Sequence, residues 1–310
     1  MKRIFIDGKS GTTGLRIFDR LADRDDIEII TLSDELRKDT AARKEALNSS
    51  DLSFLCLPDS AAIQAIKMVE NPDTVIIDAS TAHRTLSGWE YGFPEIFPDG
   101  INRIKSSKRI AVPGCHASGF AAIVKPLTDS GLLLKNAKIS CFSFTGYSGG
   151  GNAMIAEYKN ESRAATYSAP RVYALSQNHK HLKEMTSVTG LVTPPVFSPA
   201  VADFYSGMLV TVNLFGEDLV IGADVCGISE VYKSRYNGKI VFFCDSIDEN
   251  GFISANAMSG RDSMAITVNG NSDRIMISAL FDNLGKGASG AAVECMNIVF
   301  GLAPEHSLIL

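Results

Sequence analysis

The segment VPGCHASGF, residues 112–120, places a cysteine where it could act as a nucleophile. Pro113 and Gly114 form a turn signal, and the apolar run that opens after Cys115 predicts a helix. Cys115 therefore falls at a helix N-terminus, where free N–H groups and the helix dipole favour the reactive thiolate. A small buried cysteine beneath a tight turn is the plainer alternative, and position alone does not decide between the two.

Two of the five histidines, His179 and His181, stand together in the segment NHKHLKEM. Histidine titrates near neutral pH, so it could take and return the protons that a thiolate nucleophile needs exchanged. An H-x-H pair on a strand would instead turn both rings to one side, as in a zinc site. Because no third ligand stands at a plausible spacing, we expect no metal. A surface pair without a role is the remaining alternative.

A glycine-rich loop, GKSGTTG, follows the first apolar run of the chain. Gly8, Gly11 and Gly14 give the spacing GxxGxxG, a variant of the fingerprint that lets the backbone approach a pyrophosphate. A helix that begins near Thr12 would add its N–H groups and its dipole to that anion. A glycine turn without a ligand is the alternative, but the position between a predicted strand and a predicted helix favours a dinucleotide.

The end of the second predicted strand bears on which dinucleotide binds. Ser33 stands where an acidic residue often contacts the ribose of NAD, and Arg37 and Lys38 follow shortly after it. A hydroxyl and two cations suit the 2′-phosphate of NADP better than a bare ribose. Asp34 leaves NAD possible, and a solvated helix face is an equally good interpretation of the two cations.

The first third of the chain alternates short apolar runs with amphipathic stretches. Runs at 3–7, 27–32, 52–58, 74–80 and 109–114 predict buried strands, and stretches at 12–24, 40–50 and 59–70 predict helices between them. Such alternation indicates βαβ units and a parallel sheet. Ligands bind such sheets at the carboxyl ends of the strands, an edge that would hold Gly8, Pro58, Ser80 and Cys115.

Strands predominate after about residue 135. Apolar runs at 137–146, 207–215, 239–245, 263–270 and 274–282 predict strands, and 285–303 predicts a final helix. We therefore predict an α/β chain, in which a Rossmann-type domain with a parallel sheet precedes an α+β catalytic domain with a mostly antiparallel sheet. The glycine-rich segment 146–152 is expected to be a flexible loop over the site or a plain connection between strands.

Composition narrows the class of partner. The chain has 310 residues, 45% hydrophobic and 21% charged, with a net charge of −5 and no basic block, so nucleic acid is not expected. No apolar run reaches the roughly 18 residues that span a bilayer, and the N-terminus lacks the features of a signal peptide. The six scattered cysteines include no CxxC pair, which argues against a disulfide framework and favours the reducing cytoplasm.

Seven segments, taken in order, resemble the shorter form of the N-acetyl-γ-glutamyl-phosphate reductases. They are GKSGTTG, DASTAHR (78–84), YGFPEIF (91–97), PGCHASG (113–119), GYSGGG (146–151), HKHL (179–182) and NLGKGASGAAVECMN (283–297). Together the seven segments are specific for this family, although each segment alone is not. They extend over essentially the whole chain. The related aspartate-semialdehyde dehydrogenases share the architecture but set a cysteine and a histidine in different local sequences.

The resemblance implies roles for particular residues. Cys115 matches the acyl-accepting cysteine, and His181 matches the acid/base histidine. With the reasoning from the residues themselves, the predicted cofactor contacts are Gly8, Ser10, Gly11, Thr12, Thr13, Gly14, Ser33, Arg37, Lys38, Leu57, Pro58, Ser80, Asn283, Gly285 and Gly287. The predicted substrate contacts are Arg84, Ser148, Gly149 and His179, and Lys159, Arg163 and Arg171 are further cations that could also be plain surface residues.

Two positions depart from the family pattern. Lys183 stands where a proline is usual after the histidine pair, and His83 replaces an aromatic residue usual before Arg84. The first departure bears on the orientation of His181, and the second on how Arg84 is presented.

The resemblance also implies an activity and a domain plan. Residues 1–115, completed by 285–310, would bind NADP, and residues 116–284 would carry catalysis, the substrate and oligomerisation as a homodimer or homotetramer. The implied reaction reduces N-acetyl-L-glutamyl 5-phosphate with NADPH to N-acetyl-L-glutamate 5-semialdehyde and phosphate, through a cysteine thioester, in arginine biosynthesis.

Three alternatives stay open. The chain could act on another acyl phosphate, such as aspartyl phosphate or a carrier-bound glutamyl analogue. It could be a nicotinamide-binding regulator without catalysis, although the intact Cys115 and His181 argue against this. It could be a cysteine hydrolase without a cofactor, against which the glycine loop counts.

Overall fold

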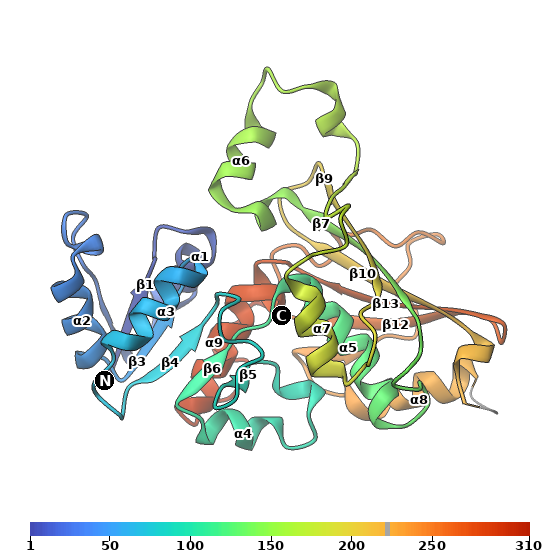
Figure 1. The fold of residues 1–310 in the computed structure, drawn as a ribbon, viewed down its shortest axis with the longest axis horizontal. Helices are drawn as coiled ribbons and strands as arrows, with labels where there is room; N and C mark the ends of the chain where they lie inside the picture. Colours follow the sequence, from blue (N-terminus) through green and yellow to red (C-terminus); the bar gives the residue numbers. More distant parts are fainter. Residues whose placement is uncertain (221–223) are drawn as a thin grey trace. The chain divides into compact units, whose positions relative to one another are not determined.

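The computed structural model describes residues 1–220 and 224–310, which form two compact units. The first unit comprises Met1–Pro113 and Ala288–Leu308, and the second comprises Gly114–Gly287 and Ile309–Leu310. The chain thus begins in the first unit and comes back to it with its C-terminal helix, drawn in red in Figure 1.

The first unit contains a six-stranded parallel sheet with the strand order β2-β1-β3-β4-β6-β5. Its strands are β1 (Lys2–Asp7), β2 (Ile27–Ile30), β3 (Leu52–Leu55), β4 (Val75–Asp78), β5 (Glu90–Tyr91) and β6 (Arg109–Ala111). Its helices are α1 (Thr12–Leu21), α2 (Thr40–Ser49), α3 (Asp59–Met68), α4 (Gly100–Ser106) and α9 (Gly290–Val299). The predicted parallel sheet is confirmed, with β5 and α4 as additions.

Both faces of this sheet are buried by helices. Ile4 and Ile6 of β1 pack with Ile17 of α1 and with residues of α9, whereas Phe5 packs on the other side with Leu47 of α2 and with α3. Successive side chains of a strand point to opposite faces, so an uninterrupted apolar run is what a sheet covered on both faces requires. The carboxyl edge of the sheet remains for a ligand.

The second unit contains a seven-stranded mixed sheet with the order β11-β12-β13-β10-β7-β9-β8. Its strands are β7 (Ser140–Gly146), β8 (Arg171–Val172), β9 (Val196–Ala202), β10 (Met208–Phe215), β11 (Val241–Phe243), β12 (Met264–Gly270) and β13 (Arg274–Phe281). Four of the six pairings are antiparallel, and β7–β9 and β11–β12 are parallel, which confirms the mostly antiparallel prediction. The helices are α5 (Cys115–Asp129), α6 (Gly151–Lys159), α7 (His181–Thr189) and α8 (Val225–Arg235).

Helix α5 is buried along nearly its whole length and carries Cys115 at its first position. Pro126 interrupts its hydrogen-bond ladder, because proline has no N–H to offer the carbonyl of Ala122. The Tyr236 hydroxyl donates to that carbonyl instead, at 2.7 Å. The helix therefore continues past the proline without a buried orphan carbonyl.

Two segments of the second unit bear on possibilities raised in the sequence analysis. The segment 146–152 is not a loop, because Tyr147–Gly150 forms a 3₁₀ turn that leads directly into α6. The H-x-H pair does not lie on a strand, because His181 is the first residue of α7. Strand β9 was not predicted because Pro199 interrupts its pattern, and proline is normally depleted in strands.

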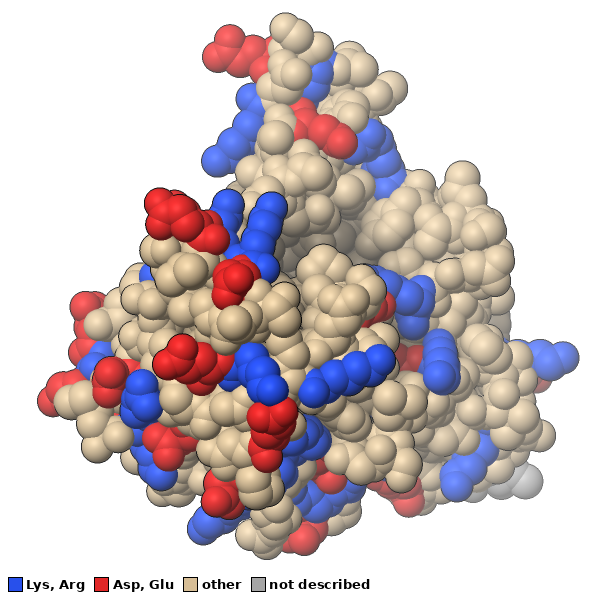
Figure 2. Space-filling view, turned by 60° about the vertical axis from the view of Figure 1, so that its left-hand side comes forward, with Lys and Arg blue, Asp and Glu red and all other residues tan. Residues whose placement is uncertain are grey.

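Charges of both signs are mixed on one face of the molecule. Lys and Arg side chains alternate with Asp and Glu over the face shown in Figure 2, so that face has no broad patch of one sign. Within residues 1–220 and 224–310, every helix is too short or too polar to cross a membrane.

Candidate active site

Cys115 opens helix α5, as the turn signal before it predicts. Gly114 is the N-cap residue and provides no capping side chain, so the first N–H groups of the helix are not occupied by a cap. The Gly114 N–H donates to Oε1 of Glu184 at 2.8 Å, and the Glu184 side chain is 2% exposed. Cys115 itself is half-buried, which leaves a thiol that a small substrate can reach.

Three histidine rings gather at the start of α5. The centroid of the His116 ring lies 5.6 Å from that of His181 and 5.7 Å from that of His179, and the His179 and His181 centroids are 4.6 Å apart. Glu184 follows His181 by one helical turn, so its bond to Gly114 holds the first turn of α7 against the first turn of α5. The structure therefore brings both predicted histidines to the neighbourhood of Cys115.

Burial keeps two of these rings uncharged. It lowers the pKa of His116 to about 3, with a smaller contribution from His179. Burial also lowers the pKa of His179, and the charge of Lys180 lowers it further. The Nδ1 atom of His179 accepts a hydrogen bond from the His181 backbone N–H at 3.2 Å, so the proton of the neutral His179 ring lies on Nε2. No group of three His, Cys, Asp or Glu side chains in the described part of the chain could hold a metal ion.

Sequence reasoning missed two residues of this cluster. Glu184 could have been found from its spacing to His181 if α7 had been predicted. Tyr173, whose hydroxyl lies 2.6 Å from Nε2 of His116, stands in a connection between β8 and α7 and carries no sequence signal.

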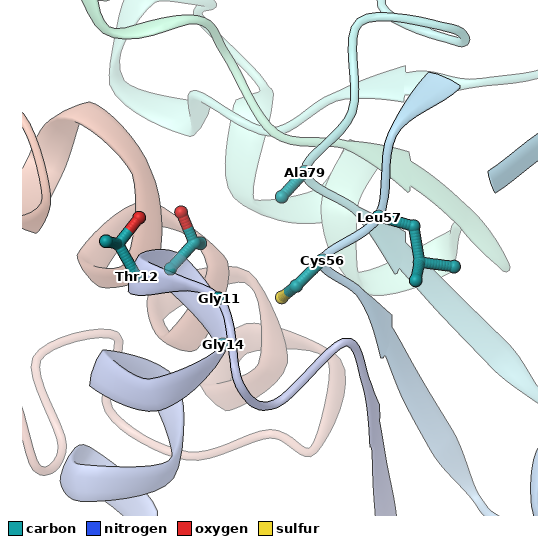
Figure 3. Close-up of a pocket in the computed structure, with 7 residues that line it drawn as sticks. Gly11, Thr12, Gly14, Cys56, Leu57 and Ala79 are labelled. Atoms are coloured by element: carbon teal, nitrogen blue, oxygen red, sulfur yellow. The ribbon is translucent and has the colours of Figure 1, made fainter. Parts of the chain in front are cut away.

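A pocket of about 180 Å³ lies at the carboxyl edge of the parallel sheet, within the first unit (Figure 3). It is lined by Gly11, Thr12, Thr13, Gly14, Cys56, Leu57 and Ala79. In Figure 3 the Thr12 side chain stands on one side and those of Cys56 and Ala79 on the other, while the Leu57 side chain points away. The glycine loop and the Leu57-Pro58 turn thus meet, as predicted for a ligand at this edge.

The glycines of this loop fit a dinucleotide. A Cβ at Gly8, where φ is +88°, would lie 2.3 Å from the carbonyl oxygen of Cys56, and one at Gly14 would lie 2.5 Å from that of Gly8. At Gly11 a Cβ would lie 3.5 Å from the nearest atom, an ordinary contact, so the fold itself does not demand glycine there. Gly11 is also the N-cap of α1 and leaves its first N–H groups uncapped, which suits a pyrophosphate that approaches the backbone.

The predicted phosphate cations lie on the surface beside this loop. Nη1 of Arg37 lies 3.5 Å from Oγ of Ser10, and Nε of Arg37 lies 3.6 Å from Asp34. Lys38 belongs to the same exposed 3₁₀ turn, Leu36–Lys38. The Ser33 hydroxyl is exposed and donates to Glu35 at 3.0 Å. The structure thus brings Arg37, more directly than Ser33 or Lys38, to the glycine loop.

Two other predicted residues are engaged within the first unit. The Ser80 hydroxyl donates to the buried carboxylate of Asp78 at 2.6 Å. Arg84 donates from Nε to the carbonyl of Val112 at 2.8 Å and from Nη2 to that of Ala79 at 3.1 Å. These bonds give Ser80 and Arg84 a structural role that the sequence does not predict.

His83, which departs from the family pattern, contacts both a carboxylate and an aromatic ring. Its Nδ1 lies 2.6 Å from the Asp78 carboxylate, and its ring stacks on that of Trp89 with centroids 4.1 Å apart. The imidazole thus replaces an aromatic residue as a flat packing partner.

Asn283 and Ser148, predicted for the cofactor and the substrate, bond to each other. Nδ2 of Asn283 donates to Oγ of Ser148 at 3.0 Å, and Oδ1 of Asn283 accepts from the Gly207 N–H at 2.9 Å. Gly149 lies next to this pair, since a Cβ on it would lie 3.5 Å from Nδ2 of Asn283. The hydrogen bond between Ser148 and Asn283 therefore holds the 3₁₀ turn before α6 against the segment that follows β13.

Gly285 and Gly287 belong to the second unit, together with Cys115. A Cβ at Gly287 would lie 3.1 Å from Cβ of Cys115, and one at Gly285 would lie 2.0 Å from the carbonyl oxygen of Arg261. Both glycines allow the backbone to pass close to its neighbours, and Gly287 does so at Cys115.

The remaining candidate cations have partners of their own. Arg163 binds both carboxylate oxygens of Asp203, at 2.8 and 2.5 Å, and Arg171 donates to the Tyr158 hydroxyl at 2.8 Å. Nζ of Lys159 lies 5.9 Å from the centroid of an exposed tyrosine ring. The structure favours their surface role over substrate binding.

Two family models match the chain. The semialdehyde dehydrogenase NAD binding domain matches residues 3–104, which include the glycine loop, and the semialdehyde dehydrogenase dimerisation domain matches residues 115–283. The second model is named for dimerisation, so we expect this chain to form an oligomer.

Solved structures share the fold. Aspartate semialdehyde dehydrogenase II from Vibrio cholerae, in complex with ASA, has a TM-score of 0.74 at 14% identity and covers 97% of this chain and 98% of its own. Aspartate semialdehyde dehydrogenase from Candida albicans, solved with NADP, has a TM-score of 0.67 at 13% identity, with coverage of 97% and 98%.

Curated relatives are much closer in sequence. The N-acetyl-gamma-glutamyl-phosphate reductase of Trichormus variabilis is 40% identical over 323 residues and covers 99% of both chains. That of Allorhizobium ampelinum is 40% identical over 304 residues, with coverage of 96% of this chain and 98% of its own. The resemblance drawn from the seven segments is confirmed, and the chain belongs to the N-acetyl-γ-glutamyl-phosphate reductase family.

Proposed function

We propose that this chain reduces N-acetyl-L-glutamyl 5-phosphate to N-acetyl-L-glutamate 5-semialdehyde and phosphate with NADPH, in arginine biosynthesis. The observation that carries the proposal is Cys115 at the N-terminus of α5, with His181 of α7 in the cluster beside it, in a chain 40% identical over its full length to reductases of that name. A regulator would need neither side chain, and a hydrolase would not need the glycine cradle.

Cys115 is the proposed nucleophile. Its thiolate attacks the acyl carbon, a C–S bond forms, and the C–O bond to phosphate breaks with its electron pair leaving on phosphate. The uncapped N–H groups of the first turn of α5 stabilise the thiolate and the oxyanion that develops on the acyl oxygen. The product is a thioester, which accepts hydride far more readily than a carboxylate does.

The first unit is the proposed NADP-binding domain. Gly11, Thr12 and Gly14 hold the pyrophosphate at the N-terminus of α1, and Arg37 pairs with the 2′-phosphate, assisted by Ser33 and Lys38. When bound, NADPH supplies the hydride that reduces the thioester. Pro58, the N-cap of α3, bounds the same edge of the sheet.

His181 is the proposed proton carrier. It removes the hydroxyl proton of the thiohemiacetal at Cys115, so that the C–S bond breaks and the aldehyde leaves while the thiolate is restored. His179, Ser148 and Gly149 are proposed substrate contacts, because His179 adjoins His181 and the other two lie in the turn before α6. For Arg84 the support is the family resemblance alone.

The second unit is the proposed catalytic and oligomerisation domain. The family model that it matches is named for dimerisation, and we propose a homodimer or a homotetramer. We also propose that the enzyme works in the cytoplasm, where its six free cysteines would stay reduced.

The reverse reaction gives the direct test. Purified wild-type protein and the Cys115→Ser variant are mixed with N-acetyl-glutamate 5-semialdehyde, NADP and inorganic phosphate, and NADPH formation is followed by its absorbance. We expect a signal in the wild type that requires phosphate and disappears in Cys115→Ser, because serine cannot supply a thiolate. A wild type that binds NADPH but gives no signal here and a strong one with aspartate semialdehyde would overturn the substrate assignment.

A further inference from the structure

A buried ion pair adjoins the glycine loop, and the proposed function does not use it. Asp7 is the last residue of β1 and directly precedes Gly8. Arg43 of α2 donates to the Asp7 carboxylate from Nη2 at 2.7 Å and from Nε at 3.2 Å, with Nε shared between both oxygens. The side chains of Asp7 and Arg43 are only 4% and 13% exposed, so water screens the two charges poorly.

The backbone ties Asp7 to the wall of the pocket. The carbonyl of Asp7 accepts from the Cys56 N–H at 2.8 Å, and Cys56 lines the pocket. The carbonyl of the next residue, Gly8, accepts from the N–H of Gly11 at 3.0 Å, and Gly11 lines the pocket as well. Asp7 is therefore one hydrogen bond away from one lining residue, and its neighbour Gly8 is one hydrogen bond away from another.

The charge of this carboxylate opposes the proposed ligand. NADP carries a pyrophosphate and a 2′-phosphate, and the glycine loop offers its N–H groups to such anions. Charges interact over roughly 8–10 Å at physiological salt, and over longer distances where burial reduces screening. Burial raises the pKa of the Cys56 thiol, and the charges of Asp78 and Asp7 raise it further, so the charge of Asp7 acts on a lining residue. An uncompensated Asp7 would repel a phosphate without touching it.

We propose that Arg43 acts on the cofactor site through Asp7: its positive charge cancels that of the carboxylate, and the glycine loop can then accept the phosphates of NADP. The inference rests on the proposed function only for the place of the cofactor. Arg43 needs no contact with the cofactor in this role, because Nε and Nη2 both bind the carboxylate.

Two substitutions should change NADPH affinity in opposite directions. Arg43→Gln leaves a buried carboxylate without its counter-charge, and we expect the affinity to fall on the order of tenfold, as one poorly screened charge acts on the phosphates. Asp7→Asn leaves the guanidinium without its carboxylate, and we expect the affinity to rise several-fold. A role of the ion pair in the fold alone would weaken binding in both variants.

The double variant Asp7→Asn/Arg43→Gln removes both charges and should bind NADPH about as well as the wild type. Direct binding of a phosphate by Arg43 would instead leave the double variant as weak as Arg43→Gln. Lys44→Gln is the matched control, because Lys44 is the next residue of α2 and its Nζ binds the exposed Glu70 at 2.6 Å. It removes the same charge from the chain, and we expect it to leave the affinity unchanged.

NADPH affinity is measured by titration of NADPH fluorescence at about pH 8, where Asp7 remains ionised. Thermal melting without NADPH checks the fold of each variant. Both single variants should melt below the wild type, because each breaks a buried ion pair, so the titrations are made well below the lowest melting temperature. Should Arg43→Gln fail to fold, Asp7→Asn and the double variant carry the test, with binding at least as tight as the wild type expected in both.

Two results would overturn the inference: weaker binding in Asp7→Asn, or a double variant that binds more weakly than the wild type to the same extent as Arg43→Gln. The same variants separate the inference from the proposed function. The expected affinity pattern in a protein without reductase activity would reject the proposed function and keep the inference. Reductase activity in a wild type whose two single variants bind NADPH equally weakly would reject the inference and keep the function.

Discussion

Neighbouring residues at the start of α5 have opposite environments. Cys115 is half-buried and can meet a substrate, whereas the His116 ring is enclosed by Ser143, Tyr173 and the other two histidines. A helix turns about 100° per residue, so two successive side chains necessarily face different directions. This alternation places a half-buried thiol and a buried polar ring in one short segment.

The buried neutral His116 should make the fold sensitive to acid. The pKa of His116 is about 3 in the folded chain and 6.5 for an unperturbed histidine, as in the unfolded chain. Between these two pH values the unfolded chain binds a proton at this residue and the folded chain does not. The stability associated with this group is complete above pH 6.5 and declines as the pH falls toward 3, by about 2 kcal/mol at about pH 5. Urea unfolding of the wild type from about pH 7 to about pH 5 measures the slope.

The matched variant for this prediction is His116→Gln, which does not titrate in this range. Carboxylates contribute to the acid sensitivity of both proteins, so only the difference between the two slopes reports on His116. Parallel curves for wild type and His116→Gln would show that the ring is not held neutral by burial.

The elements divide into those with local signals and those fixed by distant contacts. The glycine loop and the turn before Cys115 could be predicted because glycine and proline act within a few residues of themselves. Helix α7 could not be predicted in this way. It is held against α5 by the hydrogen bond from Gly114 to Glu184, and these residues are 70 positions apart in the sequence. The same holds for Ser143, which reaches His116 across 27 residues. The sequence therefore predicts Cys115 and His181 as candidate site residues, but it does not predict Glu184 and Ser143 around them.

The glycine loop allows a matched pair of substitutions. Gly14→Ala should destabilise the first unit by about 1–3 kcal/mol, because its Cβ would lie 2.5 Å from the backbone oxygen of Gly8. Gly11→Ala should leave the melting temperature nearly unchanged, because its Cβ meets only an ordinary contact at 3.5 Å. The same Cβ occupies the space through which a pyrophosphate approaches, so NADPH binding should weaken at least about tenfold.

Thermal melting and titration of NADPH fluorescence separate the two effects. A Gly11→Ala protein that melts like the wild type and binds NADPH equally well would contradict the role of this loop as a phosphate cradle.

The sheet of the second unit has one face that its own helices cover and one that bears half-buried aromatic side chains. Val210 pairs with Ser143 across β10 and β7, and a Cβ at Gly119 would lie 2.5 Å from Val210, so α5 covers that face. Phe142 and Phe144 alternate with Ser143 along β7 and therefore point to the other face. This strand lies in the part of the chain that matches the dimerisation model, and we predict that a second copy packs on this face.

Replacing Phe144 by aspartate should therefore break the oligomer. Leu209, directly opposite Phe144 in the ladder, is half-buried as well, so the new carboxylate would be trapped against an apolar neighbour whenever two copies meet. We expect wild type to sediment as a dimer or tetramer and Phe144→Asp to sediment as a monomer at the same concentration. Phe252→Asp is the control, because Phe252 is 75% exposed and lies outside the strands. Its sedimentation should match the wild type, and a Phe144→Asp protein that remains fully oligomeric would place the interface elsewhere.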